Sequence, residues 1–224
     1  MKNSVLLMIM VALFHNAVAQ SHLGLEQYYY FGKSQDISLV SIGYYQNSHN
    51  WYGEVRYNYE EKKTMSIYAG KTFYGDGKLS YTATPILGIL MGEFNGGSLG
   101  INIDITYKNI DLLSQIQYVF SNKDRNNNFF LSWSELGYQI LPFMKSGIAF
   151  QQSKVYKSSL KLEAGAFIGF SYKNWEVPIY VFSPAGTERN YVIGINWVWQ
   201  HDTRTNNNHG PVPSLKGRRK LAIE

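Results

Sequence analysis

The chain has 224 residues, a formal net charge of +5 at pH 7, no cysteine, 16% aromatic residues and 17% charged residues. The absence of cysteine excludes disulfide frameworks, thiolate metal sites and cysteine nucleophiles. The length suits one sizeable all-β domain rather than two.

The N-terminus has the pattern of a secretory signal peptide. Lys2 supplies a positive charge, an apolar core follows over 5–14, and Ala17-Val18-Ala19 is a small-x-small cleavage pattern. This apolar run is too short to span a bilayer as a helix. We therefore predict a signal peptide over 1–19, a mature chain from Gln20, and export from a bacterial cytoplasm.

Beyond the signal, apolar and polar residues alternate with a period of two, and turn-forming residues separate the segments. The segment lengths suit the roughly 9–11 residues that a tilted strand needs to cross a bilayer. The pattern predicts about twelve strands, over 23–31, 37–45, 51–59, 64–73, 79–91, 98–107, 110–120, 128–139, 144–152, 159–172, 175–183 and 190–199.

The connections between these segments differ in length. Residues 108–109 and 173–174 are two-residue turns, whereas 121–128 and 183–190 are longer and polar. Alternating short and long connections are typical of an antiparallel up-and-down transmembrane β-barrel with short periplasmic turns and longer outer loops. The turn at 108–109 also fixes a register, in which Ile105 faces Leu112 and Asn102 faces Gln115. The turn at 173–174 likewise pairs Phe170 with Val177.

The faces of the strands bear on the choice between a membrane barrel and a soluble one. The polar faces are rich in Gly, Asn, Gln and Ser, whereas a soluble exterior carries more charge. We therefore expect Ile101, Ile103 and Ile105 to face lipid. Leu131 and Trp133 share a face with Glu135, and its orientation stays open. A soluble exported β-barrel that binds a small apolar ligand is the alternative.

The polar faces give the candidate lumen residues, with pairing expected between Glu54 and Arg56 and between Lys161 and Glu163. These candidates are Glu54, Arg56, Asn58, Asn102, Asp104, Gln115, Gln117, Lys161, Glu163 and Asn196. A partly filled lumen would hold Phe167, Tyr180, Phe182, Leu113 and Val119.

The segment "YVIGINWVW" over 191–199 looks like the aromatic-ended last strand of an outer-membrane barrel. With the signal and the series of long strands, the chain resembles small bacterial outer-membrane β-barrel proteins of about twelve strands. The resemblance implies an outer-membrane location, contact with outer-membrane lipid, and insertion by the barrel-assembly machinery. Trp199 is not terminal here. We predict a barrel domain over 20–199 and a basic, disordered tail over 200–224.

Candidate chemistry is sparse. The five histidines include none in a predicted strand at the outer rim, so His49 beside Ser48 is the best candidate pair for a lipid-modifying hydrolase or acyltransferase. Glu54, Asp104 and Glu163 lack metal-ligand spacing and are interpreted as solvated or ion-paired lumen residues. We predict no catalytic, cofactor or metal site.

Two functions remain open at this level. One is a narrow pore for a small solute, and the other is a structural or interaction barrel that presents its loops to a partner. A near-neutral body with a basic tail gives no support for nucleic-acid binding. The enzyme and the soluble barrel are the alternatives to both.

Overall fold

The computed structural model describes residues 21–32, 35–155, 161–186 and 189–201. The predicted signal peptide over 1–19 and residues 202–224 of the predicted tail lie outside the described residues. Within the described part, the chain forms thirteen strands and one short 3₁₀ helix. The strands are β1 (Ser21–Gly32), β2 (Gln35–Gln46), β3 (Trp51–Tyr57), β4 (Thr64–Lys71), β5 (Phe73–Gly75), β6 (Leu79–Gly92), β7 (Gly96–Tyr107), β8 (Ile110–Ser121), β9 (Phe129–Leu141), β10 (Met144–Val155), β11 (Lys161–Tyr172), β12 (Trp175–Phe182) and β13 (Asn190–His201), and the helix is η1 (Arg125–Asn127).

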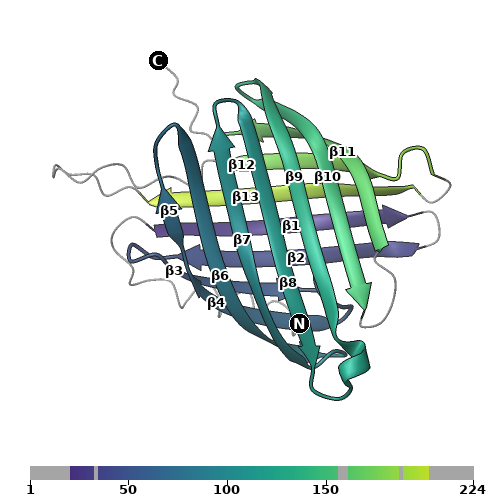
Figure 1. The fold of residues 1–224 in the computed structure, drawn as a ribbon. Helices are drawn as coiled ribbons and strands as arrows, with labels where there is room; N and C mark the ends of the chain where they lie inside the picture. The colour runs from purple at the N-terminus through teal and green to yellow at the C-terminus, as the bar shows by residue number, and fades with distance from the viewer. Residues whose placement is uncertain (1–20, 33–34, 156–160, 187–188, 202–224) are drawn as a thin grey trace, which may run out of the picture.

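The strands form one antiparallel sheet that closes into a barrel (Figure 1). Consecutive strands are neighbours except β4 and β5, which both pair with β6, and β1 pairs with β13. Among the described strands only the three-residue β5 pairs on one side alone, so closure satisfies the backbone groups along the rest of the wall, as a membrane interior requires. The predicted all-β, antiparallel up-and-down barrel is confirmed.

The strand count is twelve because β4 and β5 are two pieces of one strand. Gly70 pairs with Ile86 and Phe73 pairs with Ala83, so both pieces follow one register on β6. The break lies opposite Pro85, whose carbonyl faces Gly70. Proline has no N–H to donate on that side, so the ladder is interrupted there.

The predicted hairpin registers are confirmed. Across the turn at 108–109, Ile105 pairs with Leu112 and Asn102 pairs with Gln115. Across 173–174, Phe170 pairs with Val177. Lys108 and Lys173, the first residues of the two turns, have φ of 52° and 53°.

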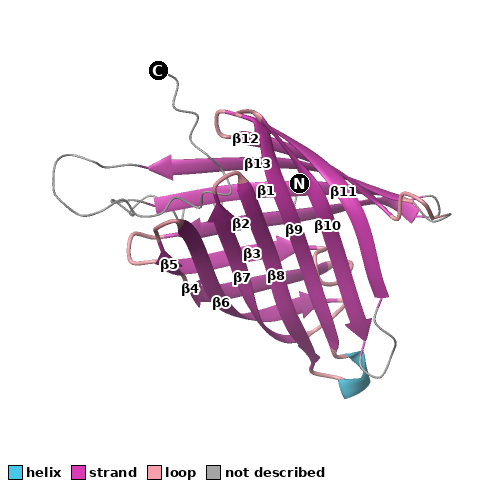
Figure 2. Ribbon diagram, turned by 45° about the horizontal axis from the view of Figure 1, so that its top comes forward, coloured by secondary structure: helices cyan, strands magenta, loops and turns pink. Residues whose placement is uncertain are grey.

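The two ends of the barrel have different connections. The short-turn end has the links 47–50, 76–78, 108–109, 142–143 and 173–174. The long-loop end has 58–63, 93–95, 122–128 and the partly described 183–189, and it carries η1, which is cyan in Figure 2. This difference matches barrels with short periplasmic turns and longer outer loops.

The outer surface of the barrel is apolar. Leu87 and Ile89 near the middle of β6 are 69% and 55% exposed, whereas Ile86 and Leu90, which flank this pair, are buried. Exposed aromatic rings lie toward the strand ends, including Trp51, Tyr172 and Trp175 at the short-turn end and Tyr57, Phe120 and Tyr191 at the long-loop end. An aliphatic band between aromatic girdles is the surface that a barrel presents to lipid.

No helix in the described part of the chain is long and apolar enough to cross a membrane.

Candidate functional site: the barrel lumen

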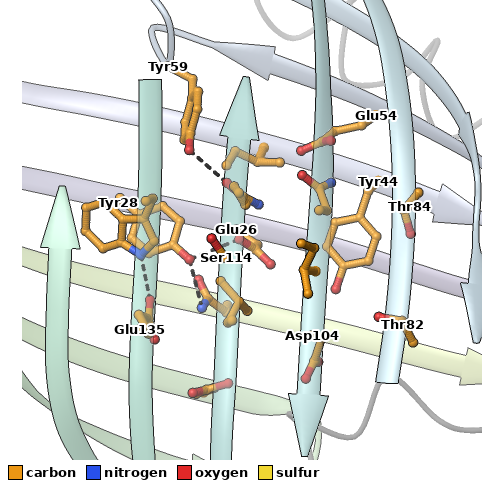
Figure 3. A pocket seen from close by; sticks show the side chains of 18 of the residues that line it. Glu26, Tyr28, Tyr44, Glu54, Tyr59, Thr82, Thr84, Asp104, Ser114 and Glu135 are labelled. Carbon is orange, nitrogen blue, oxygen red and sulfur yellow. Dashed lines mark hydrogen bonds between the residues drawn. The ribbon is translucent and has the colours of Figure 1, made fainter. Parts of the chain in front are cut away.

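The lumen contains a cavity of about 140 Å³. Alternation along the strands turns every second side chain inward. Five of the predicted lumen residues line this cavity: Glu54, Asn102, Asp104, Gln115 and Asn196. Figure 3 shows side chains from several strands pointing into this space, among them Glu26, Tyr44 and Asp104.

Arg56 on β3 is the centre of a buried polar cluster. Its Nε and Nη2 donate to the two carboxylate oxygens of Glu54 at 2.9 and 3.1 Å. Its Nη1 donates to Glu60 Oε1 at 3.1 Å and to Gln117 Oε1 at 2.8 Å. We call these four residues the Arg56 cluster. The sequence predicted the Glu54–Arg56 pair, and Glu60 was missed because it lies in a loop.

The Arg56 cluster crosses the lumen. Gln117 is on β8, and three strands of the wall, β4, β6 and β7, separate it from β3. Tyr59, in the 58–63 loop, adds a second crossing contact, because its hydroxyl donates to Gln115 Oε1 at 2.8 Å. The guanidinium lies 4.5 Å from the ring centroids of both Tyr59 and Tyr68, a cation–π distance. These contacts hold the two walls together near the long-loop end.

A second set of contacts joins β9 to β12. Trp133 Nε1 and the Tyr180 hydroxyl donate to Glu135 Oε1 at 2.7 and 2.8 Å. Trp133 also packs edge-on against Tyr180 and Phe182, with centroids 5.2 and 5.3 Å away. Trp133 and Glu135 line the lumen cavity, so their face of β9 points inward. The sequence alone left this orientation open.

Apolar side chains fill the lumen around these contacts. Of the residues expected to fill it, Phe167, Tyr180, Phe182 and Val119 are buried, and Leu113 lines the cavity. Toward the long-loop end the lumen is therefore packed like a protein core.

The polar part of the cavity lies toward the short-turn end. We call this part the vestibule, and it is lined by Glu26, Thr82, Thr84, Asn102, Asp104, Asp111, Lys145, Glu176 and Asn196. Lys145 Nζ contacts Glu176 Oε1 at 2.9 Å, with both side chains 11% exposed. Glu26 and Glu176 are cross-strand neighbours of Asn196 on either side.

The sequence prediction missed Glu26, Asp111, Lys145 and Glu176. Strand alternation alone could have found Asp111, because it pairs with Thr106 on the same face as Asn102 and Asp104. Lys145 and Glu176 are the second residues of β10 and β12. The alternation of apolar and polar residues is hard to recognise so close to a turn.

Three predicted lumen residues line neither the cavity nor the Arg56 cluster. Asn58 is outside β3, in a turn with φ of 59°. There its side chain donates to the Leu39 carbonyl and accepts from the Lys63 amide, so it caps the loop. Lys161 and Glu163 do pair, at 2.7 Å, but they lie at the long-loop end of β11 and the Lys161 side chain is 72% exposed.

The candidate dyad lies on the surface. Ser48 Oγ and His49 Nδ1 are 3.4 Å apart in an exposed turn. Asn47 Oδ1 accepts from the backbone amides of His49 and Trp51, so it does not orient the ring. Among the described residues, no group of three or more His, Cys, Asp or Glu is arranged to hold a metal ion.

Comparison with known proteins gives the fold. No protein-family model matches the chain, and no curated protein matches it. Among solved structures, KdgM porin aligns with a TM-score of 0.57 at 10% identity, covering 78% of this chain and 98% of that one. KdgM porin in complex with disordered oligogalacturonate gives 0.54 at 10% identity over the same shares. The chain therefore has the fold of a small outer-membrane porin barrel.

Proposed function

We propose that the protein is a narrow outer-membrane channel for small polar solutes. The observation that carries this proposal is the vestibule, a polar cavity enclosed by a barrel whose outer surface is apolar. A purely structural barrel has no need for an interior lined by carboxylates and amides, because buried polar groups are costly unless they are partnered.

The packed long-loop half limits passage. The Arg56 cluster and Tyr59 span the lumen there, so solute passage requires these contacts to open. The Tyr59 contact is the simpler one to break, since Tyr59 lies in a loop and reaches across to a single amide oxygen. Its loss removes a crossing contact and leaves the strands intact.

Conductance in planar bilayers tests the proposal. The wild-type barrel is expected to give small, discrete currents, and Tyr59→Ala is expected to enlarge them. Tyr57→Ala is the matched control, because Tyr57 is 45% exposed on the outer surface of the same strand end. If neither the wild type nor Tyr59→Ala conducts, the structural barrel is favoured instead.

The oligogalacturonate in complex with KdgM is a poor guide to the solute of this chain. Oligogalacturonate is a chain of carboxylate-bearing sugars. The cavity here is itself rich in carboxylates, which repel such a solute. The hydrolase alternative is not favoured, because Ser48 and His49 are neighbours on one exposed turn, and no hydrogen bond from another described residue orients the ring.

Export and insertion complete the proposal. The pattern over 1–19 supports a signal peptide, and Trp197 and Trp199 near the end of β13 support delivery by the barrel-assembly machinery. Because β13 pairs with β1 along its whole length, it is the strand that closes the barrel. The experiment is depletion of that machinery in growing cells, which is expected to leave the protein unfolded in the periplasm.

A further inference from the structure

The cavity that includes the vestibule is strongly acidic. Its described lining has six carboxylates and one ammonium, so its formal charge is −5. The carboxylates belong to Glu26, Glu54, Asp104, Asp111, Glu135 and Glu176, and the ammonium to Lys145. If Arg56, which binds Glu54, is also counted, the formal charge is −4. A cleft lined by one sign of charge concentrates ions of the opposite sign.

Asn196 adds an acceptor that no protein group satisfies. Its side chain is buried, with 4% of the residue exposed, and its Oδ1 has no hydrogen-bond partner. Its Nδ2 donates to the Tyr28 hydroxyl at 3.3 Å, and that hydroxyl donates to Glu26 Oε2 at 3.0 Å. An ionised carboxylate can only accept, so the Tyr28 hydroxyl donates to Glu26 and accepts from Asn196 Nδ2. Asn196 Oδ1 is therefore left without a donor.

Asn102 presents a second such atom. Its Oδ1 is also buried without a hydrogen-bond partner, and it too lines the cavity. Asn102 is on β7 and Asn196 is on β13, which are on opposite sides of the barrel ring. Two orphaned acceptors therefore flank an acidic space from facing walls. A buried acceptor without a donor is costly, so each such atom in a native structure calls for a donor.

The two unsatisfied acceptors require a solute with hydrogen-bond donors, and the acidic lining favours a solute with positive charge. We propose that the vestibule selects small organic cations that carry N–H donors, such as alkylammonium or guanidinium groups; this inference rests on the proposed channel function. The N–H groups satisfy Asn102 and Asn196 while the charge is held by the carboxylates. Tyr28 and Tyr44, shown in Figure 3, line the same cavity and add aromatic faces, to which cations are attracted.

Three four-carbon solutes of matched length separate charge from size. Putrescine is a dication, 1,4-butanediol is neutral and succinate is a dianion. Entry is measured as the excess over protein-free liposomes, because neutral butanediol also crosses lipid unaided. In liposomes that contain the full barrel, putrescine is expected to enter about tenfold faster than butanediol, and succinate more slowly still. If butanediol enters faster than in protein-free liposomes but putrescine is no faster than succinate, the cation proposal is overturned and the channel stands.

Charge variants assign the effect to the vestibule. The double variant Glu26→Gln, Asp104→Asn is expected to remove most of the preference for putrescine. The control Glu61→Gln, Glu93→Gln changes the net charge equally at exposed positions of the long-loop end and is expected to leave the preference unchanged. Equal losses in the two double variants would mean that overall charge, not the vestibule, sets the preference, and would overturn the proposal.

Binding is measured separately from passage, by calorimetry on the detergent-solubilised barrel. Putrescine is expected to bind and succinate not to bind. Asn196→Leu is expected to weaken putrescine binding about tenfold, whereas Asn196→Asp retains the acceptor and preserves it. If no solute enters liposomes, the channel function fails, and binding then decides the site. The proposed site is overturned if putrescine does not bind, or if both Asn196 variants bind it as tightly as the wild type.

Discussion

At the scale of the residue, Arg56 is the most consequential side chain in the lumen. It is fully buried and neutralises two buried carboxylates, Glu54 and Glu60. Arg56→Met leaves both carboxylates buried without their cation, which is expected to lower the free energy of unfolding by about 3–5 kcal/mol. Urea unfolding in lipid vesicles, followed by tryptophan fluorescence, measures this loss.

The matched control is another ion pair near the same loop. Lys63 and Glu93 contact at 2.9 Å, but their side chains are 74% and 58% exposed. Exposed pairs contribute little to stability, so Lys63→Met is expected to leave the unfolding curve unchanged. Arg56→Met unfolding at the same urea concentration as Lys63→Met would show that the Arg56 cluster does not stabilise the barrel.

At the residue level, strand alternation is easiest to read in the middle of a long strand. Asn102, Asp104 and Asn196 lie in the middle of long strands, and the structure places all three on the cavity. Glu60 and Asn58 show the limit. Both lie in the 58–63 loop, where backbone direction follows from turn geometry, so Glu60 turns inward and Asn58 caps the turn. The contact between Arg56 and Gln117 joins residues far apart in sequence, and no local pattern encodes it.

At the scale of the strand, the two faces are expected to respond oppositely to charge. Leu87 lies near the middle of β6, is 69% exposed and faces lipid. Leu87→Arg is expected to lower the free energy of unfolding by about 2–4 kcal/mol, because the charge enters the bilayer interior. Asn102→Arg, at similar depth on neighbouring β7, faces the acidic cavity and is expected to cost much less. Equal losses in vesicle unfolding would contradict this assignment of faces.

Strands and registers were the most predictable features because each depends on local information. A two-residue turn fixes the pairing of the strands that flank it, and period two then fixes every face. The break between β4 and β5 was not predicted. It depends on Pro85 of the neighbouring strand, which the pattern of residues 64–73 does not contain.

At the scale of the whole molecule, the difference between the two ends predicts the orientation in the outer membrane. With long loops outside and short turns in the periplasm, η1 is at the cell surface and the vestibule lies toward the periplasm. The chain has no cysteine, so single cysteines report position without background. A membrane-impermeant maleimide is expected to label Asn126→Cys, in η1, on intact cells. Asn109→Cys, in a short turn, is expected to react only after the outer membrane is permeabilised. The reverse pattern would place the acidic vestibule at the cell surface, where cations would meet it before the packed half of the lumen.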